Sequence, residues 1–350
     1  MRFEATPRQD AGFPWGDNRP TISQRAAFAV FISLIAALMH FVRAGETAGF
    51  SDFTSVWYGA RFLLEGQNPY ELIGPGRLVP TPSPPFYPAP AFVAAIPLTL
   101  FSAHWAGTVF VLLSSALLAW GSTADGWHRL PLFPSIAFLT SVQLGQWSVI
   151  FTAAAFIPAL AFISIAKPQA SLPVVIGNRS STAFWWSVGG GAFLLAASLW
   201  LMPQWPGEWW SLFERTDHFA PPIARFGGIA ICLVLLRWRR AEAWLVFVAA
   251  CVPQTWYPYN SLILLIVAAT YREACVLSLV SSFGWVIAAL AGDGNTRSPE
   301  SREIMGAILV AACYLPATIV VLRRPDEGSW PFWMRWLRRP RDVYIESSGR

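Results

Sequence analysis

Two ionisable residues stand where this chain could do chemistry beside a membrane. Asp52 opens a helical pattern inside a polar stretch, residues 44–88, that separates the first two apolar runs. Lys167, the only lysine of the chain, ends a later apolar run. A carboxylate beside lipid is a candidate general base, because a low dielectric raises its proton affinity. A nearby cation could stabilise a negative charge that develops during a reaction.

Each of these residues also has a plainer interpretation. Aspartate is favoured at helix starts, so Asp52 could be a helix cap alone, or a cap and a base together. Lys167 could be an anchor whose long stem carries its charge to the interface, although an ionisable residue at membrane depth is a functional hypothesis by default. Glu46, Glu65 and Glu71 are competing carboxylates, and none occupies so constrained a place.

The helix that would position Asp52 is visible as a periodic pattern. Apolar residues recur at three- and four-residue spacing, which is typical of one helical face, and they are Phe53, Val56, Trp57, Ala60, Leu63 and Leu64. Gly66 suits the left-handed position that ends a helix. The pattern predicts a short helix lying in the membrane interface.

Amides and aromatic residues in later runs are candidate ligand contacts. Gln143 and Gln146 could bind substrate hydroxyl groups, although hydrogen bonding between helices is the commoner use of amides inside membranes. Trp256, Tyr257 and Tyr259 form an aromatic turn that could stack on a ligand. Anchoring in the aromatic belt at the membrane surface is the alternative for each of these three.

The composition indicates a protein whose solvent is lipid. Hydrophobic residues make up 55% of the chain and charged residues only 13%, whereas soluble domains carry about a quarter charged residues. The first 25 residues lack a secretory signal, so residues 26–42 are expected to form an uncleaved first membrane helix. We expect an all-α polytopic transmembrane bundle with cytoplasmic tails at 1–25 and 323–350 and a membrane domain at 26–322.

The number of membrane passes is expected to be ten to twelve. Apolar runs fall at 26–43, 89–101, 104–120, 131–145, 147–165, 168–178, 183–203, 221–236, 241–254, 258–271, 274–291 and 305–322. Those at 89–101, 168–178 and 241–254 are shorter than the roughly 20 residues that a perpendicular span needs, and are predicted to be half-helices or re-entrant elements.

Charge predicts the orientation. With a cytoplasmic N-terminus and twelve passes, sixteen of the 25 basic residues lie inside; they are Arg2, Arg8, Arg19, Arg25, Arg179, Arg237, Arg239, Arg240, Arg272 and the seven arginines of the C-terminal tail. This bias follows the positive-inside rule and places residues 44–88 outside. The aromatic and basic segment 330–336 is expected on the anionic inner leaflet, or else in a plain disordered tail.

Other classes of protein fit poorly. The excess of five positive charges is spread as membrane-flanking clusters, so we expect no nucleic-acid partner. The four cysteines all sit in apolar runs, where thiols behave as small hydrophobic groups. Their spacing matches neither a metal site nor a disulfide framework, and we expect no metal and no cofactor.

The first outer loop resembles a known family. It contains Asp52-Phe53, Trp57-Tyr58-x-Ala60-Arg61, Leu63-Leu64-x-Gly66-x-x-Pro69-Tyr70 and Tyr87-Pro88, followed later by Gly145-Gln146 and Lys167-Pro168-Gln169. This order resembles the signature of glycosyltransferase family 87, integral membrane enzymes of the GT-C fold that are similar to polyprenyl-phosphate-mannose-dependent mannosyltransferases. The resemblance covers residues 45–170 and is loose beyond them.

The resemblance implies a reaction and a place. Asp52 would be the catalytic aspartate and general base of an inverting transfer, in which a sugar passes from a polyprenyl-phosphate donor to a lipid or glycan acceptor. Lys167, Arg61 and Arg225 would be candidates to stabilise the departing phosphate. The resemblance favours mannose and leaves a pentose such as arabinose open. It also implies the outer face of a bacterial plasma membrane.

The substrate-binding residues expected beside Asp52 are Arg61, Tyr70, Tyr87, Gln146, Lys167, Trp256 and Tyr257. Two other classes of function stay open. Short, interrupted helices with polar groups are also typical of transporters, so a flippase for lipid-linked substrates is one alternative, although no paired repeat is visible in the sequence. A non-catalytic scaffold is the other, and it predicts that Asp52→Asn is harmless.

Overall fold

Helices make up most of the chain in the computed structural model, which describes residues 19–46, 51–177, 180–213, 220–255, 257–291 and 299–328. The helices up to the middle of the chain are α1 (Ile22–Glu46), α2 (Asp52–Leu64), α3 (Pro69–Leu72), α4 (Ala89–Ala95), η1 (Ile96–Leu100), α5 (Ala103–Ser122), η2 (Leu130–Leu132), α6 (Ile136–Gln143), α7 (Ser148–Ala154), η3 (Pro158–Ala166), α8 (Pro168–Gly177) and α9 (Ser181–Leu201).

The later helices are α10 (Trp205–Phe213), η4 (Pro222–Ala224), η5 (Gly228–Arg237), α11 (Ala241–Cys251), η6 (Pro258–Val267), α12 (Tyr271–Ala291), α13 (Pro299–Leu309), the π-helical turn η7 (Val310–Tyr314) and α14 (Leu315–Leu322). The other η elements are 3₁₀ helices. Two short parallel strands, β1 (Ile73–Gly74) and β2 (Val79–Pro80), lie in the first loop.

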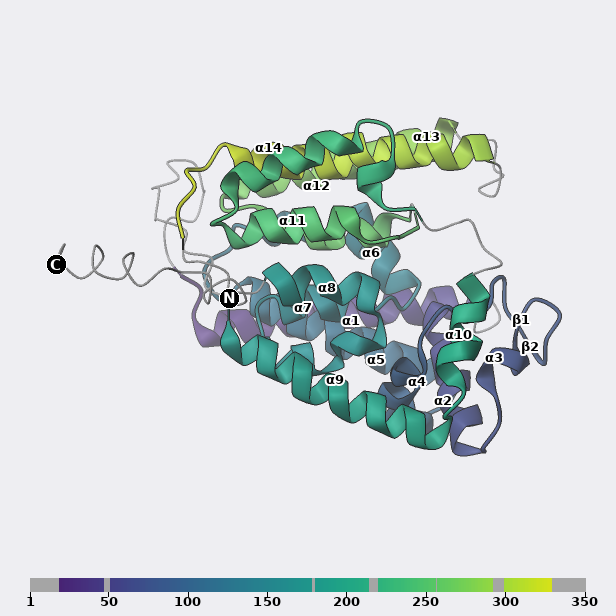
Figure 1. Cartoon of the computed structure of the whole chain (residues 1–350). Helices are drawn as coiled ribbons and strands as arrows, with labels where there is room; N and C mark the ends of the chain where they lie inside the picture. Colours follow the sequence, from purple (N-terminus) through teal and green to yellow (C-terminus); the bar gives the residue numbers. More distant parts are fainter. Residues whose placement is uncertain are drawn as a thin grey trace, which may run out of the picture.

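The two halves of the chain form two layers of helices. In Figure 1 the layer that contains α1, α5, α7, α8 and α9 lies below the layer of α11 to α14. α6 connects the layers, because it packs on α1 on one side and on η6 and α12 on the other. α8 packs on α11 across the same boundary. We call this boundary the seam.

Five helical segments are long and apolar enough to cross a membrane, and they cover Ile22–Gly45, Ala103–Ser122, Ser181–Leu201, Tyr271–Ala291 and Ser301–Leu322. α6 and α7 together would make a sixth span, bent by 120°. This is fewer than the ten to twelve passes expected. Exposed apolar side chains such as Phe31, Trp200 and Phe283 cover the outer faces of three of these helices, as lipid contact requires.

Helix breaks explain why apolar runs outnumber long helices. Each of the twelve runs falls on helical structure, but many are divided into short pieces. Gly145 takes a φ of +64° and ends α6. Pro158, Pro168 and Pro258 each begin a new helix, because proline lacks the N–H needed to continue the preceding one. The three short runs are found as short helices, namely α4 with η1, α8, and α11.

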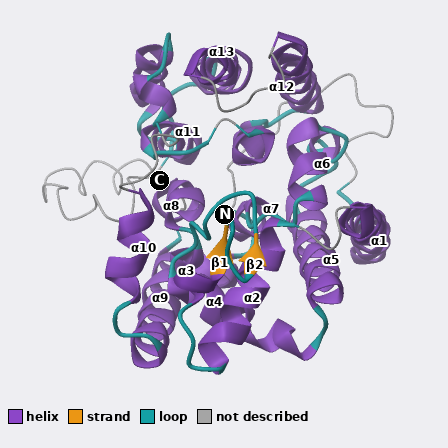
Figure 2. Cartoon of the chain, turned by 90° about the vertical axis from the view of Figure 1, so that its right-hand side faces the viewer, coloured by secondary structure: helices purple, strands orange, loops and turns teal. Residues whose placement is uncertain are grey.

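The elements of the first loop, residues 44–88, gather at one end of the bundle. α2, α3, β1 and β2, joined by α10, lie at the end that faces the viewer in Figure 2, and the start of α1 and the end of α14 lie at the opposite end. Arg25 near the start of α1 donates to the Trp120 carbonyl at 2.7 Å. The turn after α5 therefore lies at the end where α1 begins.

This connection corrects the twelve-pass map at Arg129. That map left Arg129 outside, but the turn that carries it lies beside the N-terminal end of α1, because Arg25 donates to the Trp120 carbonyl at the end of α5. Arg129 pairs with Asp125 at 2.6 Å, and Arg324 pairs with Glu273 at 2.5 Å. The end of the bundle opposite the first loop therefore contains ion pairs.

We predict that the two ends face opposite sides of the membrane. Leu78→Cys, in the first loop, should react with a membrane-impermeant maleimide in intact cells, whereas Arg239→Cys should react only after the cells are opened. Both parent side chains are exposed, so access depends on the side of the membrane. The unmodified chain with its own four cysteines is the control, and equal labelling of both variants in intact cells would contradict the topology.

Candidate active site

Asp52 is the first residue of α2, but it is not its cap. Ser51 holds the N-cap position, and its N–H donates to Thr54 Oγ1 at 3.1 Å. The interpretation of Asp52 as a helix cap is therefore wrong, since a neighbouring serine does that work. The Asp52 carboxylate is directed instead to Gln146, on a segment distant in sequence.

A tight turn between α6 and α7 brings Gln146 to Asp52. The Asp52 N–H donates to the Leu144 carbonyl at 3.0 Å, which fixes the start of α2 on this turn. Gly145 has a φ of +64°, a conformation that side chains disfavour. A Cβ atom at this position would lie 3.0 Å from both His40 Cε1 and Phe53 Cβ. The turn therefore needs glycine for its conformation and for its space.

Gln146 links the carboxylate to the lysine. Its Nε2 donates to Asp52 Oδ2, and its Oε1 accepts a hydrogen bond of 2.9 Å from Lys167 Nζ. Gln146 and Lys167 are both buried. Lys167 lies at the joint between η3 and α8, so two helix breaks, at Gly145 and at Pro168, position Gln146 and Lys167.

Two tyrosine rings enclose the ammonium group. Lys167 Nζ lies 5.1 Å from the ring centroid of Tyr87 and 5.3 Å from that of Tyr259, distances at which a cation is attracted to an aromatic face. Tyr70 fixes this arrangement, because its hydroxyl donates to the Tyr87 carbonyl at 3.0 Å. We call Asp52, Gln146, Lys167, Tyr87 and Tyr259 the Asp52 cluster; Tyr259 comes from the second half of the chain, so the cluster lies on the seam.

The surroundings make Asp52 a suitable base. Burial raises the pKa of the Asp52 carboxyl, and the positive charge of Lys167 and the hydrogen bond from Gln146 oppose this rise. Burial also raises the pKa of Tyr87, so its phenol stays neutral. A raised pKa increases the proton affinity of Asp52, while the opposing charge keeps its ionised form accessible.

The structure brings together only part of the predicted site. Four predicted residues contact one another, namely Asp52, Gln146, Lys167 and Tyr87. Tyr70 positions Tyr87 through its hydrogen bond to the Tyr87 carbonyl. Tyr257 is 41% exposed and stacks on Tyr259 with ring centroids 5.6 Å apart. Trp256 lies outside the described residues, as does the segment 330–336.

The arginines that the sequence suggested lie elsewhere. Arg61 points away from the cluster, because its side chain is 47% exposed and pairs with Glu65 at 3.3 Å. Arg225 donates to the Arg302 carbonyl at 3.4 Å, beside α13. The competing carboxylate Glu71 is exposed. Lys167 is thus the one predicted cation that the described structure places on the cluster.

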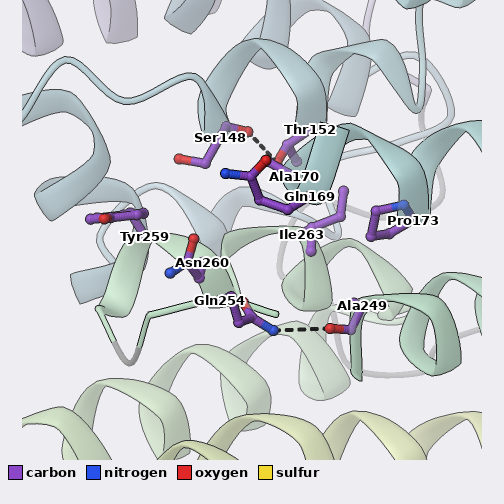
Figure 3. A pocket seen from close by; sticks show the side chains of 10 residues that line it. All are labelled: Ser148, Thr152, Gln169, Ala170, Pro173, Ala249, Gln254, Tyr259, Asn260 and Ile263. Carbon is purple, nitrogen blue, oxygen red and sulfur yellow. Dashed lines mark hydrogen bonds between the residues drawn. The ribbon is translucent and has the colours of Figure 1, made fainter. Parts of the chain in front are cut away.

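A small polar pocket lies on the seam and shares Tyr259 with the cluster (Figure 3). Its polar lining consists of Ser148 and Thr152 from α7, Gln169 from α8, and Gln254, Tyr259 and Asn260 from the second half. Of this group, the sequence pattern indicated only Tyr259 as a ligand contact. The amides Gln254 and Asn260, which flank the aromatic turn, were the signal that could have revealed it.

Comparison with other proteins gives no relative. No protein-family model matches the chain, and neither the curated proteins nor the solved structures contain a match. Within the described ranges, no three histidine, cysteine, aspartate or glutamate side chains gather as a metal site. The chemistry of the site therefore has to be inferred from the cluster itself.

We predict that Gly145→Ala destabilises the site. A Cβ would add strain at positive φ and would press on His40 and Phe53, at a cost of about 1–3 kcal/mol. Thermal unfolding in detergent should show a lower midpoint. Gly189→Ala is the matched control, because a Cβ there meets no atom within 4 Å, and an equal loss in both variants would contradict the role of the turn.

Proposed function

We propose that this protein is a membrane glycosyltransferase that moves a sugar from a polyprenyl-phosphate donor to a hydroxyl group of a lipid or glycan acceptor. The observation that carries the proposal is the buried connection of Asp52 through Gln146 to Lys167 at the end of the bundle that holds the first loop. It combines a base with a cation suited to a phosphate. The resemblance of the first loop to glycosyltransferase family 87 supports the same assignment and, through it, a GT-C fold and mannose.

In this proposal Asp52 accepts the proton of the acceptor hydroxyl. The hydroxyl oxygen then forms a bond to the anomeric carbon from the face opposite the phosphate, and the configuration inverts. The bond between the anomeric carbon and the phosphate oxygen breaks, and its electron pair leaves with the polyprenyl phosphate. The proton remains on Asp52 until solvent removes it, which returns the base to its starting form.

Lys167 would hold the phosphate. One of its three N–H donors is used by Gln146, so two are available for phosphate oxygens. The amide of Gln146 separates the ammonium from the carboxylate, which prevents their direct pairing and leaves each charge free to meet its own reactant. Positive charge placed where negative charge develops stabilises the transition state.

Transfer by the purified protein in lipid tests this proposal, with labelled polyprenyl-phosphate sugars and membrane-extract acceptors. Asp52→Asn should lower turnover by about a thousandfold, because it removes the base, while leaving folding intact, since Asn can still accept a hydrogen bond from Gln146. Thermal unfolding is the control for structure. Near wild-type turnover by a folded Asp52→Asn protein would exclude Asp52 as the base and favour a scaffold.

The pH profile separates the roles of the two charges. The Asp52 carboxyl has a raised pKa. The increase of kcat/KM with pH should therefore occur at higher pH than the titration of an ordinary aspartate. Lys167→Met removes a charge that lowers this pKa, so the rising limb should move to higher pH and the donor KM should increase. Arg61→Met is the control, because Arg61 pairs with Glu65 away from the cluster. If Lys167→Met leaves both the pH profile of kcat/KM and the KM for the donor unchanged, Lys167 is not part of the site.

A flippase for lipid-linked substrates is the second candidate. Broken helices and an uncharged polar pocket on the seam support it, because discontinuous helices frame the binding sites of many transporters. The same reconstituted protein distinguishes the two functions. Labelled donor that crosses the bilayer without forming a glycosidic product would favour transport, whereas product that depends on Asp52 would favour transfer.

A further inference from the structure

We infer that the polar pocket that shares Tyr259 with the Asp52 cluster is a specificity pocket. It would receive the exocyclic hydroxymethyl group of the transferred sugar. The inference rests on the proposed function and extends it to residues that the proposed reaction does not use. The residues concerned are Thr152, Gln169, Gln254 and Asn260 (Figure 3).

The pocket begins at the reacting groups. Ser148 follows Gln146 by two residues, and Gln169 follows Lys167 by two residues, so the turns that build the cluster also build the pocket wall. Tyr259 belongs to both, since its ring faces Lys167 and also lines the pocket. A sugar whose anomeric carbon lies beside Asp52 would therefore have this pocket within reach of its ring substituents.

The N–H donors of the Gln254 and Asn260 side-chain amides already bind other groups of the protein. Gln254 Nε2 donates to the Ala249 carbonyl at 2.9 Å and also to the hydroxyl of Tyr314. Asn260 Nδ2 donates to both the carbonyl and the hydroxyl of Thr255, at 2.9 Å each. These bonds fix the orientation of both amides, and the amide oxygens remain as hydrogen-bond acceptors for a ligand.

Those oxygens have no protein donor in the described part of the chain. Figure 3 shows the Asn260 oxygen on the side of Gln169 and the nitrogen on the far side. Gln254 is buried, with 8% of its surface exposed, and its side chain lines the pocket. The Thr152 hydroxyl donates to the Ser148 carbonyl at 2.7 Å, so it too offers lone pairs to a ligand. The pocket is thus rich in acceptors.

An acceptor-rich pocket without charge suits a hydroxyl group. None of the ten lining side chains carries a formal charge at neutral pH, so a phosphate or carboxylate would find nothing to pair with. The pocket is too narrow for a sugar ring and has room for a group of the size of one water or slightly more. A hydroxymethyl group fits both the size and the chemistry, while the ring stays beside Tyr259.

The π-helical turn η7 is part of this construction. It places Tyr314, which is fully buried, so that its hydroxyl donates to the Ala249 carbonyl at 3.0 Å and accepts from Gln254. π-helical turns inside α-helices occur frequently at functional sites, because they reorient one side chain without breaking the helix. The turn therefore holds the Gln254 oxygen in place.

The test compares two labelled donors that share one prenyl chain, a polyprenyl-phosphate hexose and a polyprenyl-phosphate pentose that lacks the hydroxymethyl group. The purified wild type should favour the hexose by about tenfold or more in kcat/KM. Ala170→Leu fills the pocket and should lower hexose transfer by about tenfold while leaving pentose transfer within about twofold. The near-isosteric Thr152→Val should lower the hexose preference without changing the packing.

Leu172→Met, on the exposed side of the same helix as Ala170, is the matched control and should leave both rates unchanged. No transfer of either sugar by the wild type would overturn the proposed function itself. Transfer without a hexose preference, or a preference that survives in both Ala170→Leu and Thr152→Val, would overturn the pocket assignment and leave the proposed function standing.

Discussion

The hydrogen bond from the Asp52 N–H to the Leu144 carbonyl is the constraint on which the candidate site depends. It attaches the first helix of the loop at 44–88 to the break between two apolar helices. Inside a membrane, backbone groups freed by such a break must find partners, and α2 supplies one of them. The same contact brings the Asp52 carboxylate to Gln146. One hydrogen bond therefore pairs the free Leu144 carbonyl and also positions Asp52 in the cluster.

The seam between the two layers has a similar double role. Breaks at glycine and proline shorten the helices at the seam. The ends of these short helices bring backbone polar groups and side-chain amides to the boundary between the layers. Tyr259 and the pocket amides come from the second half of the chain, whereas Asp52 and Lys167 come from the first. Closing the seam therefore places the Tyr259 ring of the second half against the ammonium group of Lys167 from the first half.

Some of the site could be predicted from the sequence, and the rest could not, for identifiable reasons. The periodicity from Phe53 to Leu64 gave α2 correctly, because helical spacing is a local property. The role of Asp52 as a cap was predicted wrongly, because Ser51 competes for the same position and only the backbone geometry decides between them. Arg61 shares the first loop with Asp52 but faces away, since rotation around a helix separates neighbours in sequence.

The sequence by itself determined that the chain is a mostly helical protein with helices apolar enough for lipid, and it singled out the ionisable pair of Asp52 and Lys167, because composition and local spacing carry this information. Only the tertiary structure decided that Gln146 connects the pair, that Tyr259 joins it from the second half, and where breaks divide the longer apolar runs. These facts depend on contacts between segments up to about 200 residues apart, and on breaks whose angles a linear pattern does not record.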